Sequence, residues 1–312
     1  MRTTRAIAGL ALLLLAVPAF AWNYEGHRII AAIAYDRLTP AVRARVDALI
    51  RKHPDYETIL TKDAPADPAA RARYAFLTAA TWPDLIRSDP RFYDENWAAA
   101  TPAPPIAGFP DSKRHLTWHY YDNPYSADGT PGAATPPPNA LTELRRLIPE
   151  IRTAKIGQTG GDALAAYDLP WIEHLIGDVH QPLHATSRYL KSQPQGDQGG
   201  NLVFVAPGRN LHAIWDNSPG INLSEAYTAR YAHEVTLDNP ESPGLSLDPK
   251  DWIDESYALD KSDVYTFGLE TGSQEKPVRL PPGYEENARK IARRRVAIAG
   301  YRLARVLNQQ LR

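Results

Sequence analysis

The chain has 312 residues, and its 35 basic and 36 acidic side chains give a formal net charge of −1. This balance excludes a global basic surface of the kind that holds a polyanion, so any binding of nucleic acid would depend on local charge. The sequence contains no cysteine, which excludes disulfide cross-links, and its 43% of hydrophobic residues is ample for a buried core.

Residues 1–21 have the features of a secretory signal peptide. Two arginines precede an apolar block at 6–17, and an Ala-Phe-Ala triplet ends the segment. This pattern predicts cleavage before Trp22, and the apolar block is too short to span a membrane. We therefore expect an exported protein, periplasmic or secreted, without stable membrane association. Its mature chain, residues 22–312, is expected to form one domain.

Two helices are predicted at the start of the mature chain. Residues 22–38 carry apolar side chains at helical spacing, and a Thr-Pro pair at 39–40 is typical of the start of a second helix, which would end near Lys52. His27 falls in the first turn of the first helix. If cleavage frees Trp22, its α-amino group and carbonyl oxygen could chelate a metal together with His27. A surface histidine beside a chain end is the alternative.

A carboxylate and an arginine follow a helix break in the next segment. Residues 71–85 are rich in alanine and predict a helix, which Pro83 interrupts. Asp84 comes directly after the break, where a carboxylate can point inward, and Arg87 lies one helical turn later. Asp84 is therefore a candidate ligand or catalytic group, with an N-cap as the ordinary alternative.

Loops rich in proline and glycine are predicted at 101–110 and 122–138. The stretch between them places His119 between aromatic residues, including Tyr120. These rings could wall a site and stack on a base or sugar, or they could belong to the core.

The most informative stretch is 171–184. His174 and Asp178 stand four residues apart in an apolar, helix-compatible run, so both side chains project from one face within reach of a shared ion. Pro182 cannot continue the helix and is expected to turn the chain, so that His184 faces the helix from outside. Imidazole and carboxylate ligands suit zinc. A helix with one satisfied core histidine is the alternative.

The remaining segments alternate helices with loops. A helix is expected from Asn139 to about residue 156, a short strand at 202–205 turned by Pro-Gly at 207–208, and a long helix at 284–311. Three arginines at 293–295 could touch phosphate, although we expect them to face solvent. Loops are predicted at 191–200, 237–250 and 271–283.

A second pair of candidate ligands lies between these segments. His212 and Asp216 repeat the four-residue spacing of His174 and Asp178. One such pair is common in proteins, whereas two in one chain indicate a shared function.

The order and spacing of these candidate ligands along the chain resemble those of the zinc-dependent S1/P1 nuclease family. The fold of this family is shared with bacterial zinc phospholipase C. The resemblance covers essentially the whole mature chain and implies a mainly α, single-domain fold with long loops and a short β-hairpin. Its motifs are Trp22 with Gly26-His27, Thr-Trp-Pro-Asp at 81–84, Trp118-His119, the string from His174 to His184, Gly-Gly-Asn at 199–201, and Asn-Leu-His at 210–212 followed by Asp216.

The resemblance implies three zinc ions held by nine residues. One zinc would have Asp84, His119, His174 and Asp178 as ligands; a second would have Trp22, His27 and Asp178; and the third would have His184, His212 and Asp216. Asp178 would thus bridge two ions, and Trp22 would bind through its amino nitrogen and carbonyl oxygen. By the same resemblance, Asp84 and Arg87 would be catalytic, Tyr120, Asp122 and Asn201 would contact the substrate, and His180 would be structural.

The activity implied by the family is hydrolysis of phosphodiester bonds in single-stranded DNA and RNA to 5′-phosphorylated products, with 3′-nucleotidase activity. The protein would act as a monomer on strands and nucleotides. The lack of cysteine departs from eukaryotic members, which use disulfides, and favours a bacterial exported protein.

Two alternatives remain at this point. The nearest is a zinc phospholipase C, although that branch carries Glu where this chain has Asp216, and the gap from Trp22 to His27 is short. The other is a periplasmic protein that binds zinc or nucleic acid without turnover, which would not need Asp84 and Arg87 beside an open coordination position.

Overall fold

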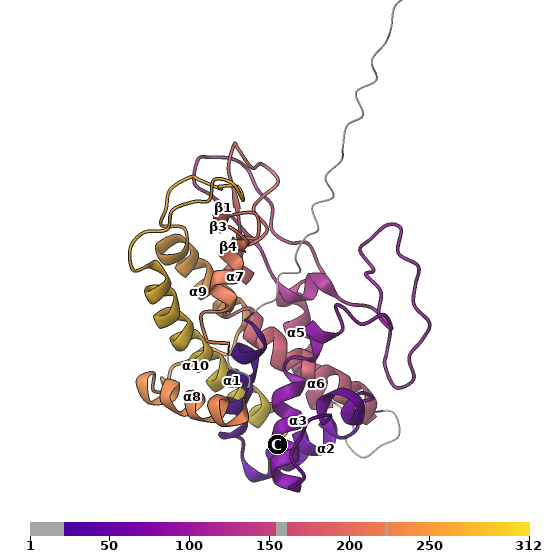
Figure 1. Cartoon of the computed structure of the whole chain (residues 1–312). Coiled ribbons are helices and arrows are strands. Elements are labelled where there is room, and N and C mark those ends of the chain that lie inside the picture. The colour runs from indigo at the N-terminus through magenta and orange to yellow at the C-terminus, as the bar shows by residue number, and fades with distance from the viewer. Residues whose placement is uncertain (1–21, 154–160, 222–223) are drawn as a thin grey trace, which may run out of the picture.

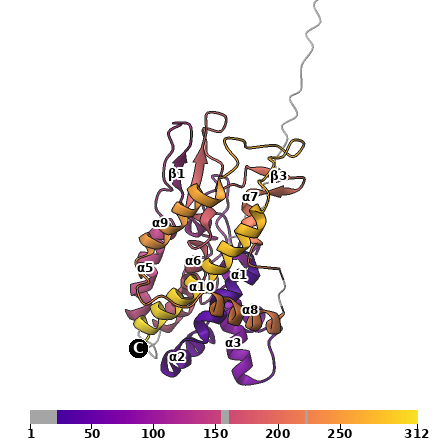
Figure 2. The same cartoon turned by 90° about the vertical axis from the view of Figure 1, so that its left-hand side faces the viewer.

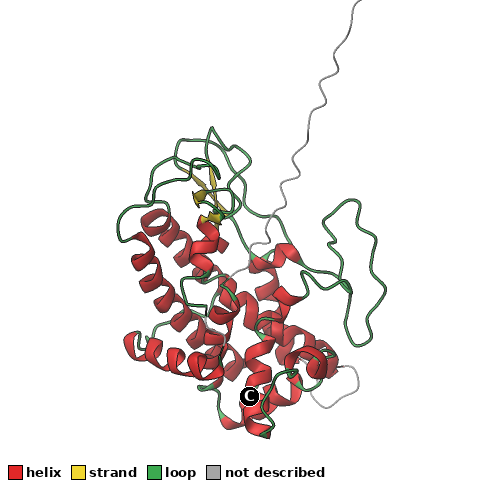
Figure 3. Cartoon of the chain, in the orientation of Figure 1, coloured by secondary structure: helices red, strands yellow, loops and turns green. Residues whose placement is uncertain are grey.

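Helices make up nearly all of the regular structure in the computed structural model, which describes residues 22–153, 161–221 and 224–312 (Figure 3). The predicted mainly α fold is confirmed. The predicted signal peptide lies outside the described residues. Among the helices of the described ranges, none combines the length and the apolar character that a membrane crossing requires.

Two helices form the centre of the helical body. In α1 (Tyr24–Tyr35), every residue from Glu25 to Tyr35 is buried. The second central helix, α6 (Gly161–Asp178), packs against α1, and the long C-terminal helix α10 (Tyr284–Gln310) lies along both of them (Figures 1 and 2).

Shorter helices surround this centre. The larger ones are α2 (Pro40–Ile50), α3 (Pro68–Ala79), α5 (Ala140–Thr153), α8 (Glu225–Asp238) and α9 (Pro249–Leu259). Two very short α-helices are α4 (Trp82–Leu85) and α7 (Leu211–Asp216). Single turns of other helix types are η1 (Tyr56–Leu60), η2 (Leu116–His119), η3 (Pro182–His184) and η4 (Asp260–Val264).

The described strands form two small sheets, which lie with long loops at one end of the helical body (Figures 1 and 3). The predicted strand near residue 204 is confirmed as a hairpin, in which β3 (Phe204–Ala206) pairs antiparallel with β4 (Arg209–Asn210). The other sheet pairs β1 (Asn123–Ser126) in parallel with β2 (Thr186–Tyr189). The prediction of a loop throughout 122–138 was therefore wrong for β1.

Local capping signals predicted two helix starts correctly. The Thr39 hydroxyl accepts a hydrogen bond from the backbone N–H of Val42 at 3.3 Å, and α2 begins at the following proline. The side chain of Asn139 accepts from the N–H of Thr142 at 3.1 Å, at the start of α5. The far end of that helix was predicted near residue 156, which lies outside the described residues.

The predicted helix at 71–85 is two helices rather than one. α3 ends at Ala79, and α4 starts at Trp82. Pro83 explains the division, because it has no N–H to donate to a carbonyl four residues earlier. The break turns the chain and leaves Asp84 only 1% exposed.

Helices α8 and α9 were not predicted. The buried positions of α8 are only Thr228, Ala232 and Val235, and two of these three side chains are small or polar. So weak an apolar stripe gives little periodic signal in the sequence. The loop predicted at 237–250 corresponds closely to the segment that joins the two helices.

The expectation that residues 293–295 face solvent was wrong for Arg295, which is 4% exposed. Its guanidinium donates to Glu255 at 2.8 Å and to the hydroxyl of Ser256 at 2.7 Å. Arg302 lies seven residues after Arg295 on α10. It donates to both oxygens of Glu255 and contacts His180 Nε2 at 2.8 Å. These arginines join α10 to α9 and to the end of α6.

We predict that Arg302→Met destabilises the fold by about 2–4 kcal/mol, because it leaves polar groups of His180 and Glu255 without their buried donor. Urea unfolding of both forms measures the difference. Arg305→Met on the same helix is the control. Arg305 pairs with Glu241 where both side chains are about one third exposed, so its loss should cost less than about 1 kcal/mol. Equal costs for both variants would contradict this assignment.

Candidate metal centre

Eight of the nine predicted ligands lie in three groups whose ligand atoms are within 4.8 Å of one another. The first group consists of Asp84, His119 and His174, the second of His27, His174 and Asp178, and the third of His184, His212 and Asp216. Every one of these side chains is buried. The structure thus brings together residues from α1, α4, α6, α7, η2 and η3 that are far apart in the sequence.

The first group has nitrogen and oxygen atoms converging from three helices. His174 Nε2 lies 3.0 Å from His119 Nδ1, and Asp178 Oδ2 lies 3.1 Å from the same nitrogen. Asp84 Oδ1 is 3.8 Å from His174 Nε2 and 3.9 Å from His119 Nδ1. The predicted set of four residues therefore faces one point.

The second group shares His174 with the first, and Asp178 lies between the histidines of both. Asp178 Oδ1 lies 3.3 Å from His27 Nε2, whereas its Oδ2 faces His119 and His174. The ring of His27 stacks on that of His174 with 4.0 Å between centroids. A carboxylate with one oxygen toward each group has the arrangement that a bridging ligand requires.

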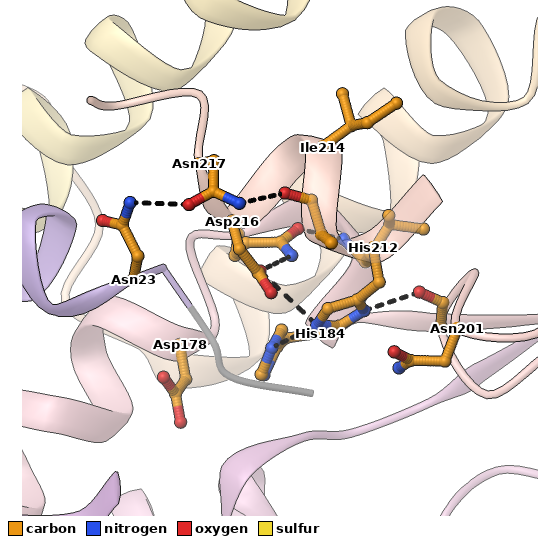
Figure 4. A network of polar contacts seen from close by, with 12 residues as sticks. Asn23, Asp178, His184, Asn201, His212, Ile214, Asp216 and Asn217 are labelled. Atoms are coloured by element: carbon orange, nitrogen blue, oxygen red, sulfur yellow. Dashed lines mark hydrogen bonds and ion pairs between the residues drawn. The ribbon is translucent and has the colours of Figure 1, made fainter. Parts of the chain in front are cut away.

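The third group combines His184, the last residue of η3, with His212 and Asp216 at the two ends of α7. His184 Nε2 and His212 Nε2 are 3.2 Å apart, and Asp216 Oδ1 is 3.5 Å from His212 Nε2 (Figure 4). The side-chain amide of Gln181 donates to Asp216 Oδ1 at 2.8 Å. Gln181 has the extended backbone that the following proline predicts, with φ −79° and ψ 119°.

Backbone carbonyls orient three of the imidazoles. The Nδ1 atoms of His174, His184 and His212 lie 2.8, 2.7 and 2.7 Å from the carbonyl oxygens of Ala80, His119 and Gly199. A carbonyl oxygen only accepts, so each Nδ1 carries a proton, and in the neutral ring Nε2 presents a lone pair to its group. This outer contact is typical of metal-binding histidines.

The atoms left without partners fit a bound cation. Among the described residues, His27 Nε2, Asp84 Oδ2 and Asp178 Oδ1 are buried without a hydrogen-bond partner. Neighbouring ligands in a tetrahedral zinc site are about 3.3 Å apart for bonds of about 2.0 Å. The distances from His174 to His119, from His27 to Asp178 and from His184 to His212 are 3.0, 3.3 and 3.2 Å and are close to this spacing.

The titration states also favour cation binding. Burial lowers the pKa of His119 to about 4, so the ring is neutral at neutral pH. Burial disfavours ionisation of Asp178, but the charge of His174 and the hydrogen bonds from His119 and His174 outweigh it and hold the pKa of Asp178 well below its ordinary value. Burial raises the pKa of Asp216 well above its ordinary value, and the charges of Asp84 and Asp178 add to this. A cation beside Asp216 would reverse that shift.

Trp22 lies beside the same centre. Its side chain is fully buried, and the N–H of the next residue, Asn23, donates to the carbonyl of Asp216 at 3.1 Å. The proposed chelation by its amino group depends on cleavage before Trp22, which stays a prediction.

The predicted catalytic and substrate residues lie around the groups. Arg87 donates to Asp84 Oδ1 at 3.2 Å, and its side chain is 17% exposed. Tyr120 directly follows His119 and is half-buried. Burial, together with the charge of Asp197, raises the pKa of Asp122 well above its ordinary value. Their roles stay predictions.

Asn201, the third predicted substrate residue, lies near His212 (Figure 4). Its side-chain amide donates to the carbonyl of Gln198 at 2.8 Å, and its oxygen accepts from Asn210 at 3.4 Å. The side chain is therefore fixed within the Gly-rich loop rather than in one of the three ligand groups.

Two residues of the centre were missed in the sequence. Gln181 holds Asp216, and its position between Asp178 and His184 is the signal that could have indicated it. Burial raises the pKa of the Tyr24 phenol, and the charge of Asp84 adds to this shift, so the two groups interact electrostatically. No sequence pattern distinguishes Tyr24 from an ordinary residue of the first helical turn.

The fold and these three groups define a helical protein with buried His/Asp groups that are able to bind metal. The family model described as S1/P1 Nuclease matches residues 22–312. The chain belongs to the S1/P1 nuclease family, as the resemblance in its motifs predicted, and a hydrolase of phosphodiester bonds is the class of enzyme that this family indicates.

Individual relatives match part of the chain. Endonuclease 4 of Arabidopsis thaliana is 30% identical over 174 residues, which are 47% of this chain and 53% of the relative. Nuclease S1 of Aspergillus oryzae is 30% identical over 164 residues, 46% of this chain and 54% of the relative. The chain spans about half of the length of these two relatives. Endonuclease 2 of Arabidopsis thaliana is 24% identical over 220 residues, 70% of this chain and 62% of the relative.

We predict that Gly177→Ala lowers the zinc content of the purified mature chain by about one ion without unfolding it. A Cβ atom at Gly177 would lie 2.7 Å from His27 Nδ1, so the imidazole or α6 must shift and the contact between His27 and Asp178 is disturbed. Elemental analysis gives the zinc content, and thermal unfolding gives the stability.

Gly300→Ala is the matched control, because its Cβ would lie 2.5 Å from Ile33 in a contact between α10 and α1 that contains no predicted ligand. We expect this control to lose stability and keep its zinc. Full zinc content in Gly177→Ala would argue against His27 as a ligand.

Proposed function

We propose that the chain is a zinc-dependent nuclease that hydrolyses phosphodiester bonds in single-stranded DNA and RNA and leaves 5′-phosphorylated products. It would also release phosphate from 3′-nucleotides. The observation that carries the proposal is the convergence of three buried His/Asp groups in a member of a nuclease family. Two of the groups share His174, and the carboxylate of Asp178 faces histidines of both. The proposed holoenzyme contains three zinc ions.

The proposed mature enzyme begins at Trp22 after removal of residues 1–21 and works as an exported monomer, in the periplasm or outside the cell. The formal charge of the full chain is −1, and loss of Arg2 and Arg5 makes it −3, so a negatively charged strand gains nothing from the net charge of the protein. Attraction for phosphate would be concentrated where the cations bind.

The residues proposed to hold zinc are those of the three groups, with Trp22 completing the one that contains His27. Bound zinc ions supply a nucleophilic water at ordinary pH and neutralise charge on the phosphate and the leaving oxygen. His174, His184 and His212 are held with their Nε2 atoms toward these positions by backbone carbonyls, so little reorganisation accompanies binding.

Asp84 and Arg87 are the proposed catalytic pair. Asp84 Oδ1 accepts from Arg87, while Asp84 Oδ2 has no hydrogen-bond partner among the described residues and can orient or accept a proton from the attacking water. The guanidinium of Arg87 is partly exposed and carries further donors, which can stabilise the negative charge that accumulates on the phosphoryl oxygens in the transition state.

The preference for single strands is proposed to come from base stacking. Tyr120 follows His119 directly and is partly exposed, so a base can lie on its ring close to the centre. A base within a duplex must leave its stack to do so, whereas a base in a single strand is already accessible. Asp122 and Asn201 would add hydrogen bonds to the nucleotide, and a carboxyl with a raised pKa, as in Asp122, can also donate one.

A substrate panel tests the reaction class. Purified mature chain should release nucleotides from single-stranded DNA and RNA, faster than from duplex, and EDTA should abolish release until zinc is restored. Asp84→Asn should reduce turnover by about 10²–10⁴-fold, since it removes a proton acceptor. Diacylglycerol release from lecithin without nucleotide release would replace the proposal by a phospholipase C. Zinc binding with no hydrolysis of either substrate would replace it by a non-catalytic binding protein.

Tyr120→Ala should weaken binding of single-stranded oligonucleotides by about 1–3 kcal/mol, because one stacked base loses its platform. The expected signature is a higher KM on oligonucleotides. Tyr120→Phe is the matched control, since it keeps the ring and removes only the hydroxyl, and its KM should stay near that of the original enzyme. Parallel losses in both variants would show that the hydroxyl, and not the stacking face, binds the substrate.

A further inference from the structure

Asn23, the second residue of the proposed mature chain, joins the start of α1 to the chain that follows Asp216 (Figure 4). Its side-chain amide nitrogen donates to Asn217 Oδ1 at 3.0 Å and to the carbonyl of Gly220 at 2.6 Å. Its side-chain oxygen accepts from the N–H of Gly26 at 3.0 Å. Its backbone N–H donates to the carbonyl of Asp216 at 3.1 Å.

The two ends that Asn23 joins both belong to the proposed metal centre. One end carries Trp22 and, four residues after Asn23, His27. The other is the C-terminal end of α7, where Asp216 belongs to the third group. The amide of Asn23 and that of Asn217 are 194 residues apart in sequence, so this contact exists only in the folded chain.

The receiving side is itself fixed. The amide nitrogen of Asn217 donates to the carbonyl of Ala213 at 2.7 Å, which turns the Oδ1 atom of Asn217 toward Asn23. The N–H of Gly220 donates to the carbonyl of Asn217 at 3.1 Å, and this closes a tight turn that presents the carbonyl of Gly220. Asn23 therefore meets two acceptors whose positions are set by other bonds.

Helix capping alone does not account for these contacts. The cap uses only the side-chain oxygen of Asn23, which binds the N–H of Gly26. Serine or threonine could supply that acceptor equally well. The two hydrogen bonds from the amide nitrogen have no part in the cap, and they point away from α1 to the segment after Asp216.

A terminal residue that acts as a chelate needs such an anchor. Chain ends fray, and ordering one residue costs roughly 1–2 kcal/mol of backbone entropy. If Trp22 were held only by its ligand bonds, that cost would reduce zinc affinity. If Asn23 anchors the chain, the backbone of Trp22 is already ordered before the ion binds. The entropy cost then no longer reduces zinc affinity, and the site is pre-organised.

We propose that Asn23 is a positioning residue, which holds the amino end of Trp22 against the ion shared with His27 and Asp178. The inference rests on the proposed three-zinc centre and adds a residue that touches no ion itself. The positioning role depends on the side-chain amide nitrogen of Asn23, because this atom donates to both Asn217 and Gly220.

Asn23→Ser separates positioning from capping, since it keeps a cap acceptor and removes the amide donors. Zinc titration of the mature protein against a competing chromophoric chelator should show that one of three ions binds about 10–100-fold more weakly, as for other lost outer contacts. Asn23→Ala should show the same loss of affinity and a lower melting temperature.

Thr39→Ala is the matched control for capping. Thr39 caps α2 through the N–H of Val42, and α2 carries none of the proposed ligands. It should therefore lower the melting temperature and leave all zinc affinities unchanged. The double variant His27→Ala with Asn23→Ser should lose no more zinc than His27→Ala alone, because both changes act on the same ion.

Wild-type affinity for all three ions in Asn23→Ser would overturn the positioning role, and so would additive zinc losses in the double variant. These results leave the proposed function intact. A wild-type mature chain with fewer than three ions would instead reject the three-zinc centre itself. The two failures are therefore distinguishable in the same titration.

Discussion

The burial of Asp178 is the constraint on which the rest of the centre depends. Its side chain is completely buried, and its two oxygens face histidines of two different groups. A carboxylate in such a place is costly unless cations or donors surround it. Here the compensation comes from imidazoles, several of which are themselves desolvated and neutral, so an added cation is the natural partner. The remaining ligands are arranged around this one side chain.

The scaffold serves this arrangement through short elements rather than long ones. Asp84, His119, His184 and Asp216 each lie in a helix or turn of six residues or fewer. Pro83 separates α4 from α3, and Pro182 separates η3 from α6. Backbone carbonyls orient the imidazole rings of three histidines. The long helices α1, α6 and α10 supply the buried core that keeps these short pieces in register, and the arginines of α10 tie the end of α6 in place.

The sequence predicted those features that have a local cause. The caps at Thr39 and Asn139, the turn at Pro182 and the His/Asp spacing in α6 each depend on a few neighbouring residues. The family and its ligand candidates followed because several such motifs occur in order. Features with a distant cause were missed. β1 pairs with β2 some sixty residues later, Arg295 is buried by partners on α9, and Asn23 acquires its contacts from the end of α7. In each case the residue alone gives no indication of its partner.

Anomalous diffraction at the zinc edge from crystals of the mature chain, grown with zinc, would test the centre most directly. Three peaks are expected, two of them on opposite oxygens of Asp178 at about 2.0–2.2 Å and one between His184 and His212. The peak beside His27 should also contact the amino nitrogen of Trp22. An empty space between the two imidazoles of the third group, or a carboxylate of Asp178 that contacts one ion or none, would contradict the shared centre described above.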